Sequence, residues 1–116
     1  MENGELNLSK TYLLVDVVDY VPGSVVIKSI MQKKTGTVSI SSFDTGEMLV
    51  AKISPFDNLI QVIDGKAEVI INEQSTLLET GQVMIIPAHA TNKVKANERF
   101  KMLSTVIKSG YEDVSL

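Results

Sequence analysis

The chain has 116 residues, of which 44% are hydrophobic and 22% are charged, and its formal net charge is −3 at pH 7. That length and balance are typical of one soluble globular domain with a hydrophobic core. The small negative charge, without a clustered basic face, excludes a nucleic-acid-binding surface. The chain has no cysteine, which excludes disulfides, thiolate metal sites and cysteine nucleophiles.

Neither the apolar runs nor the N-terminal residues indicate contact with a membrane. No apolar run approaches the ~20 residues that a membrane-spanning helix needs. The first ten residues, MENGELNLSK, lack the order of basic and then apolar residues that marks a secretory signal. We therefore predict a cytoplasmic protein with no membrane partner.

The N-terminal part of the chain has a different pattern from the rest. Between Lys10 and Asp19, apolar residues recur at helical spacing, at Leu13, Leu14, Val17 and Val18. This spacing favours a short helix, although the β-branched valines oppose it. Pro22-Gly23 ends the segment in either case. We predict an N-terminal extension, residues 1–23, that is helical or irregular, followed by one domain from residue 24 to residue 116.

After Pro22 the chain consists of short segments with strand patterns, separated by turn residues. The predicted strands are residues 24–31, 37–43, 59–63, 66–71, 75–78, 83–86, 92–96 and 100–108. Eight or nine short strands at such close spacing are typical of a β-sandwich or a closed barrel. The predicted fold class is therefore all-β.

The alternation of apolar and polar residues predicts which faces of these strands are buried. In residues 66–71 it places Ala67, Val69 and Ile71 on one face. In residues 37–43 it separates Val38 and Ile40 from a second face that carries Thr37, Ser39 and Ser41. Residues 83–86 (VMII) are apolar throughout, which favours a strand that is buried on both faces.

Turn residues predict how the strands are connected. Asp64-Gly65 lies between two strand-like runs, and this dipeptide is a strong signal for a hairpin with a type I′ turn. Asn72-Glu73 marks a further turn, from which the next strand returns. Pro87 ends the strand before it, because proline cannot donate a hydrogen bond to a central ladder.

Two spaced motifs resemble the signature motifs of the cupin family. The first, G-x5-H-x-H-x3,4-E-x6-G, is matched in spacing by Gly46, Lys52, Ser54, Asn58 and Gly65. The second, G-x5-P-x-G-x2-H-x3-N, is matched in spacing by Gly81, Pro87, His89, Asn92 and Ala96. The resemblance covers residues 24–109 and implies a double-stranded β-helix, also called a jelly-roll barrel.

The residues at the ligand positions differ from those of the family. The resemblance places metal ligands at Lys52, Ser54, Asn58 and Asn92. A divalent transition metal prefers imidazole and carboxylate ligands, whereas an ammonium group repels it and hydroxyl and amide oxygens bind it weakly. We therefore predict no functional metal and no cofactor.

These positions form a polar set that suits a small polar or anionic ligand. Met48 shares strand parity with Lys52, and His89 is the only histidine of the chain, so both are added to the predicted ligand-binding residues. The alternative is that Lys52 extends to the solvent at the mouth of the barrel and that the amides bond to the backbone.

We expect a metal-free small-ligand-binding or sensing module that does not act as an enzyme. The alternative is a cupin enzyme of the isomerase or oxygenase type with a displaced site, which would use His89 with Asp57 or Glu47, or Lys52 without a metal. That alternative requires His89 or Lys52 to lie inside the cavity. The resemblance also implies a homodimer, in which residues 24–31 could add to the sheet of a neighbour.

Overall fold

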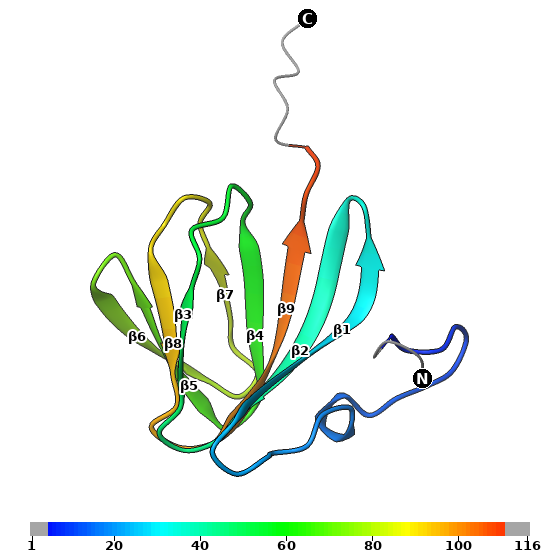
Figure 1. Ribbon diagram of the computed structural model, residues 1–116, viewed down its shortest axis with the longest axis horizontal. Coiled ribbons are helices and arrows are strands. Elements are labelled where there is room, and N and C mark those ends of the chain that lie inside the picture. The colour runs from blue at the N-terminus through cyan, green and yellow to red at the C-terminus, as the bar shows by residue number, and fades with distance from the viewer. Residues whose placement is uncertain (1–4, 111–116) are drawn as a thin grey trace, which may run out of the picture.

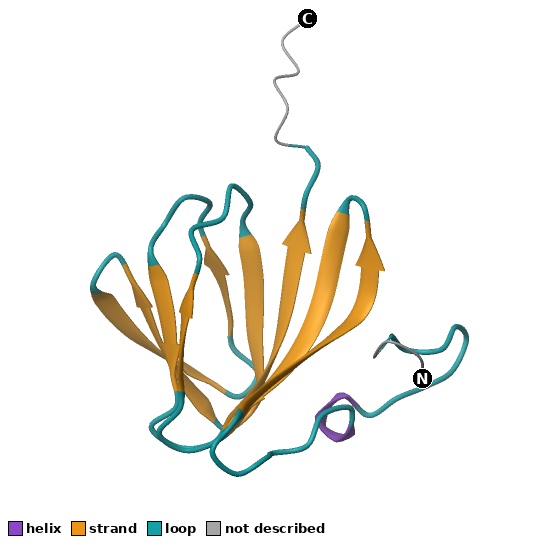
Figure 2. Ribbon diagram, viewed as in Figure 1, coloured by secondary structure: helices purple, strands orange, loops and turns teal. Residues whose placement is uncertain are grey.

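The computed structural model describes residues 5–110 and shows an all-β protein (Figures 1 and 2). Within these residues, one turn of 3-10 helix, η2 (Leu14–Asp16), precedes nine strands. The strands are β1 (Val25–Lys33), β2 (Gly36–Phe43), β3 (Met48–Ala51), β4 (Asn58–Asp64), β5 (Lys66–Ile71), β6 (Gln74–Glu79), β7 (Val83–Ile86), β8 (Asn92–Lys95) and β9 (Phe100–Ile107). Each of the eight predicted ranges matches one strand, and β3 lies within the first motif.

The strands form two antiparallel sheets. The five-stranded sheet has the order β1-β2-β9-β4-β7, and the four-stranded sheet has the order β3-β8-β5-β6. Successive strands alternate between the sheets from β2 to β5 and again from β6 to β9. This connectivity is that of a double-stranded β-helix, so the predicted fold class is confirmed. No helix in residues 5–110 is long and apolar enough to span a membrane.

The main hydrophobic core lies between the two sheets. Phe43 of β2 and Phe100 of β9 are paired across the ladder, and their stacked rings are fully buried with centroids 4.4 Å apart. Around them are other inward-facing side chains, namely Ile60, Val62, Ala67, Val69, Leu78, Ile86, Val94, Ala96 and Met102. Ala67 and Val69 are buried as their alternation predicted, and Ile71 packs beside them.

Asp64-Gly65 does not form the predicted hairpin. β4 belongs to the five-stranded sheet and β5 to the four-stranded sheet, so the two strands are not paired. Of the two turn residues only Gly65 has a positive φ, at 83°, whereas a type I′ turn needs two such residues. The dipeptide instead carries the chain from one sheet to the other.

A hairpin lies at the next turn, which is formed by Asn72 and Glu73. Both residues have positive φ, 47° and 70°, and β5 and β6 pair in register on either side of them. Asparagine tolerates the left-handed conformation because its short side chain bonds locally. The predicted turn and the return of the chain are thus confirmed.

β7 is buried on one face only, which contradicts the prediction from its apolar sequence. It is an edge strand of the five-stranded sheet. Val83 is 54% exposed and Ile85 is 59% exposed, because no element within residues 5–110 covers the outer face of the sheet at this point. Ile86, which faces the other sheet, is buried. The run VMII therefore combines a core face with an uncovered outer face.

A second, smaller core lies on the outer face of the five-stranded sheet. Val17 and Val18 of the N-terminal segment pack there against Ile30 of β1 and Ile40 of β2. Val38 of β2 packs against the same cluster. The apolar face of β2 is therefore the outer face of the sheet, which the N-terminal segment covers.

The N-terminal segment is irregular, which is the second of the two predicted alternatives, and it packs along the sheet. Between residues 5 and 23 only η2 is helical, and no helix spans residues 10–19. Polar side chains of the strands bond to backbone carbonyls of this segment. Lys28 donates to the oxygen of Val17 at 3.0 Å, Ser42 donates to that of Asp19 at 2.8 Å, and Lys101 donates to that of Val15.

Tyr20, near the end of this segment, bonds to β4, and this bond should make the stability of the protein depend on pH. Its hydroxyl donates to Asp64 Oδ2 at 2.6 Å, and burial followed by this carboxylate raises the pKa of the phenol above its ordinary value. The folded state then holds the proton more tightly than the unfolded state. The stabilisation that the protonated Tyr20 hydroxyl gives to the folded state is complete below the pKa of tyrosine in the unfolded state, about 10, and is lost as the pH rises further.

We therefore expect Tyr20→Phe to reduce the loss of stability at high pH. The thermal midpoint of the wild type should fall more steeply than that of the variant between about pH 10 and pH 12, because only the wild type loses this proton on unfolding. Thermal unfolding followed by circular dichroism at several pH values measures both slopes. Parallel slopes would contradict the assignment.

Candidate ligand-binding site

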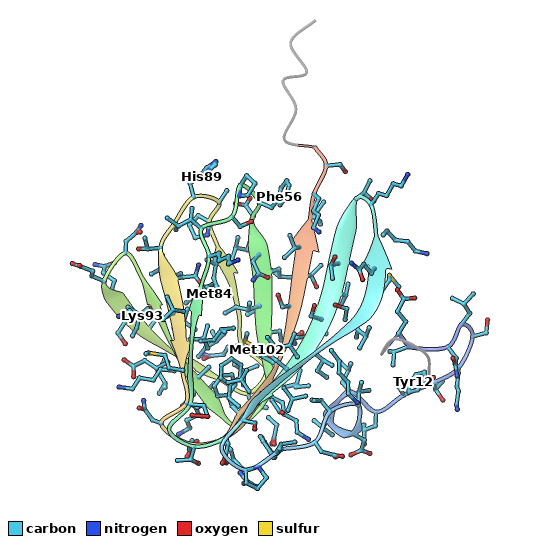
Figure 3. All side chains as sticks on the ribbon, in the orientation of Figure 1. Tyr12, Phe56, Met84, His89, Lys93 and Met102 are labelled. Atoms are coloured by element: carbon cyan, nitrogen blue, oxygen red, sulfur yellow. The ribbon has the colours of Figure 1, made fainter. Side chains whose placement is uncertain are left out.

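The two motif segments meet at one end of the barrel. Residues 52–57 connect β3 to β4, and residues 87–91 connect β7 to β8. Two hydrogen bonds join the loops. The backbone N–H of His89 donates to the backbone carbonyl oxygen of Ser54 at 2.7 Å, and the backbone N–H of Ala88 donates to Asp57 Oδ1 at 2.7 Å. Figure 3 shows Phe56 and His89 together at this end.

Asn58 and Asn92 are the two predicted site residues that face the interior. Asn58 shares its face of β4 with the buried Ile60, and Asn92 shares its face of β8 with the buried Val94. Both amides are half-buried and project from opposite sheets. Asn58 Oδ1 accepts a hydrogen bond from Ser104 Oγ at 2.6 Å, whereas Asn92 Nδ2 makes a long bond of 3.4 Å to the oxygen of Ala90.

The other four predicted residues do not join this pair on the inner faces of the strands. Met48 is 50% exposed, on the outer face of the four-stranded sheet beside Lys95. Lys52 and His89 are exposed in the two loops. Ser54 is half-buried, but its hydroxyl accepts the Phe56 N–H at 3.1 Å and so stabilises the loop.

These positions bear directly on the enzyme hypothesis. It required Lys52 or His89 to lie inside the barrel, and both are exposed. His89 also has a positive φ of 67°, which fits its place in a tight turn. Neither Lys52 nor His89 therefore lies in the interior, where that alternative placed at least one of them.

The side chains at the four motif positions do not fit a transition metal. An ammonium group, a hydroxyl and two carboxamides provide neither imidazole nitrogen nor carboxylate oxygen. Among residues 5–110 there is no group of three or more histidine, cysteine, aspartate or glutamate side chains that could hold a metal ion. The described residues thus have the spacing of the cupin motifs without the ligands that a transition metal prefers.

The structure adds hydroxyl groups that the sequence prediction did not include. Ser29, Ser39 and Ser104 lie in one row across β1, β2 and β9 on the inner face of the five-stranded sheet. Ser41 lies one row further along β2, is 4% exposed, and its Oγ has no hydrogen-bond partner. The alternation in β2 contained this signal, but it did not show which face of the strand is the inner one.

Comparison with solved structures places this fold among the cupins. A conserved protein of unknown function from Streptococcus pyogenes has a TM-score of 0.84 and 24% identity, and the match covers 90% of this chain and 92% of that one. A cupin superfamily protein from Desulfitobacterium hafniense has a TM-score of 0.84 and 23% identity, with 90% and 96% coverage.

A third similar structure is more alike in sequence but longer. A cupin 2 conserved barrel domain protein from Leptotrichia buccalis has a TM-score of 0.80 and 31% identity, and the match covers 84% of this chain but 47% of that protein. No family model matches the sequence, and no curated protein does. The likeness to known proteins therefore comes from the comparison of structures.

Proposed function

We propose that this chain, which has the cupin fold, binds a small polar molecule, without a metal, where the two motif loops meet. One observation carries the proposal. Two positions at which the family's motifs place metal ligands, Asn58 and Asn92, face the interior from opposite sheets and are half-buried. Carboxamides both donate and accept hydrogen bonds, so they suit a polar organic ligand better than a cation.

The condition of Asn92 also supports a binding function. Its side-chain amide donates one hydrogen bond, to the backbone oxygen of Ala90, which is 3.4 Å long, and the side chain is not fully buried. The donor–acceptor distance of an N–H···O bond is most often about 2.9–3.0 Å, so this amide is held weakly by the protein. A ligand could take over its donor and acceptor at little cost to the fold.

The experiment has two parts, and both use protein purified without chelators. Elemental analysis should find far less than one zinc, iron, manganese or nickel ion per chain, and EDTA should leave the thermal midpoint unchanged. Thermal shift measurements in EDTA, with a panel of sugars, polyols, carboxylates and sugar phosphates, should then find a compound that raises the midpoint.

Two variants connect that binding to the site. We expect Asn92→Ala to abolish the ligand-induced shift with little loss of stability, because its own bond is long. Asn97→Ala is the matched control, since Asn97 is exposed and bonds to Glu68 instead, at 2.9 Å. One tightly held metal ion per chain, or equal shifts in both variants, would overturn the proposal.

A further inference from the structure

We infer that the inner face of β1, β2 and β9 is a hydroxyl-lined part of this site and that it takes a neutral, polyhydroxylated molecule such as a sugar or a polyol. The inference rests on the proposed function and specifies the class of ligand. It is carried by three observations: a row of serines, a buried hydroxyl without a partner, and the absence of charge on the inner faces of the described strands.

The serines are brought together by the register of three neighbouring strands. Ser29 pairs with Ser39 between β1 and β2, and Ser39 pairs with Ser104 between β2 and β9. Directly opposed residues of adjacent strands have Cβ atoms about 4.5–5.5 Å apart. Ser104 in turn donates to Asn58, so the row is continuous with one of the two inward-facing amides. The hydroxyls and the amide thus form one polar surface.

Ser41 supplies the observation that points to a ligand. It lies on the same inner face, between Ile27 and Met102 in the ladder, and it is 4% exposed. Its Oγ is the one side-chain polar atom of the described residues that is buried without a hydrogen-bond partner. Buried hydroxyls are normally bonded, and an unbonded one costs free energy. A hydroxyl group of a bound molecule would satisfy it.

The lack of charged side chains on this surface disfavours an anionic ligand. The inward-facing positions of the strands carry apolar, hydroxyl or amide side chains. The cations of the same strands face the other way: Lys28 and Lys101 bond to carbonyl oxygens of the N-terminal segment on the outer face. A carboxylate or phosphate would therefore be desolvated at the serine row without a partner of opposite charge.

Part of this surface is accessible to solvent. Ser29, Ser39 and Ser104 are half-buried, and Ile27 on the same face of β1 is 55% exposed. β1 is the edge strand of its sheet and lies on the opposite side of the fold from β6 (Figure 1). Apolar Ile27 and Met102 flank Ser41, so C–H groups and hydroxyls of a sugar would each meet suitable atoms.

The test uses neutral and anionic molecules of the same shape. Labelled protein is titrated in EDTA with methyl glucoside and myo-inositol, and separately with glucuronate and glucose 6-phosphate, while backbone amide signals are followed by NMR. We expect the neutral compounds to shift amides of β1, β2 and β9, and the anionic compounds to shift none of them. Ser39→Ala should weaken the binding by roughly twofold to tenfold, which is the usual effect of one hydrogen bond.

Ser41→Ala distinguishes a ligand contact from a defect of the fold. It should raise the thermal midpoint of the free protein, because a buried unbonded hydroxyl is removed, and it should weaken binding. Ser42→Ala is the control on the same strand. Ser42 faces outward, is fully buried and bonds to Asp19, so its loss should lower the midpoint and leave the affinity unchanged.

The outcomes separate this inference from the proposed function. Binding of the anionic compounds alone, or unchanged affinity in Ser41→Ala, would overturn the serine-lined site and leave metal-free binding intact. Binding of none of these compounds, with no shift from the wider panel either, would overturn both. Binding of the neutral compounds that Ser39→Ala and Ser41→Ala weaken, and Ser42→Ala does not, would establish the site.

Discussion

Gly65→Ala is expected to lower the free energy of unfolding by about 3 kcal/mol or more, because it combines backbone strain with a steric clash. Gly65 has a φ of 83°, in the left-handed region that other residues rarely adopt. A Cβ atom added there would lie 2.5 Å from the backbone oxygen of Arg99 and 3.0 Å from Cβ of Phe100. Neither neighbour can move easily, since Phe100 is fully buried in the core.

Gly81→Ala is the matched control, because it isolates the backbone strain. Gly81 has nearly the same φ, 88°, but an added Cβ would meet no atom within 4 Å. Its substitution should therefore cost only the strain, on the order of 1–2 kcal/mol. Chemical denaturation of both variants measures the difference. Equal losses would show that the approach of Arg99 and Phe100 to the turn does not matter.

The Gly65 turn also shows why local signals identified a turn but not its role. The sequence Asp-Gly between two strand-like runs predicts a reversal of the chain, and the chain does turn there. Whether the next strand pairs with the last one depends on the rest of the sheet. β4 already has β7 and β9 as neighbours, so β5 has no free edge to join. Such competition between strands cannot be found in a dipeptide.

Strand positions and faces could be predicted to different extents. The glycine, proline and turn spacing located the strands and the two motif loops, and the alternation in β5 identified its buried face correctly. In β2 the alternation was equally clear, but the apolar face is covered by Val17 and Val18, and the hydroxyl face is the one that faces the barrel interior. Which face is inside depends on a segment that lies far away in the sequence.

The candidate site was partly predictable for the same reason. Motif spacing located Asn58 and Asn92, because the start of each of their strands is fixed by the loop before it. It could not show that Lys52 and His89 are exposed, since both lie in loops, where strand parity does not apply. The serine row required the register of β1, β2 and β9, which pairs residues from distant parts of the chain. The inner chemistry of a barrel is thus a property of its register.

Val18→Asp is expected to destabilise the protein by about 3 kcal/mol or more, because it places an ionisable group in an apolar environment. Val18 is 1% exposed and packs on the outer face of the five-stranded sheet with Val17, Ile30 and Ile40. If the segment is an integral part of the fold, the carboxylate must either be buried or detach the segment. Detachment would expose the outer face of β2 and leave Lys28 without its bond to Val17.

Leu13→Asp is the comparison within the same segment. Leu13 is 66% exposed, so its replacement should change the stability by no more than about 0.5 kcal/mol, as is usual for surface substitutions. Denaturant unfolding of the two variants and the wild type gives the values. Similar stability of all three would mean that residues 5–23 do not contribute to the fold. A loss confined to Val18→Asp would show that the N-terminal segment stabilises the sheet whose other face carries the serine row.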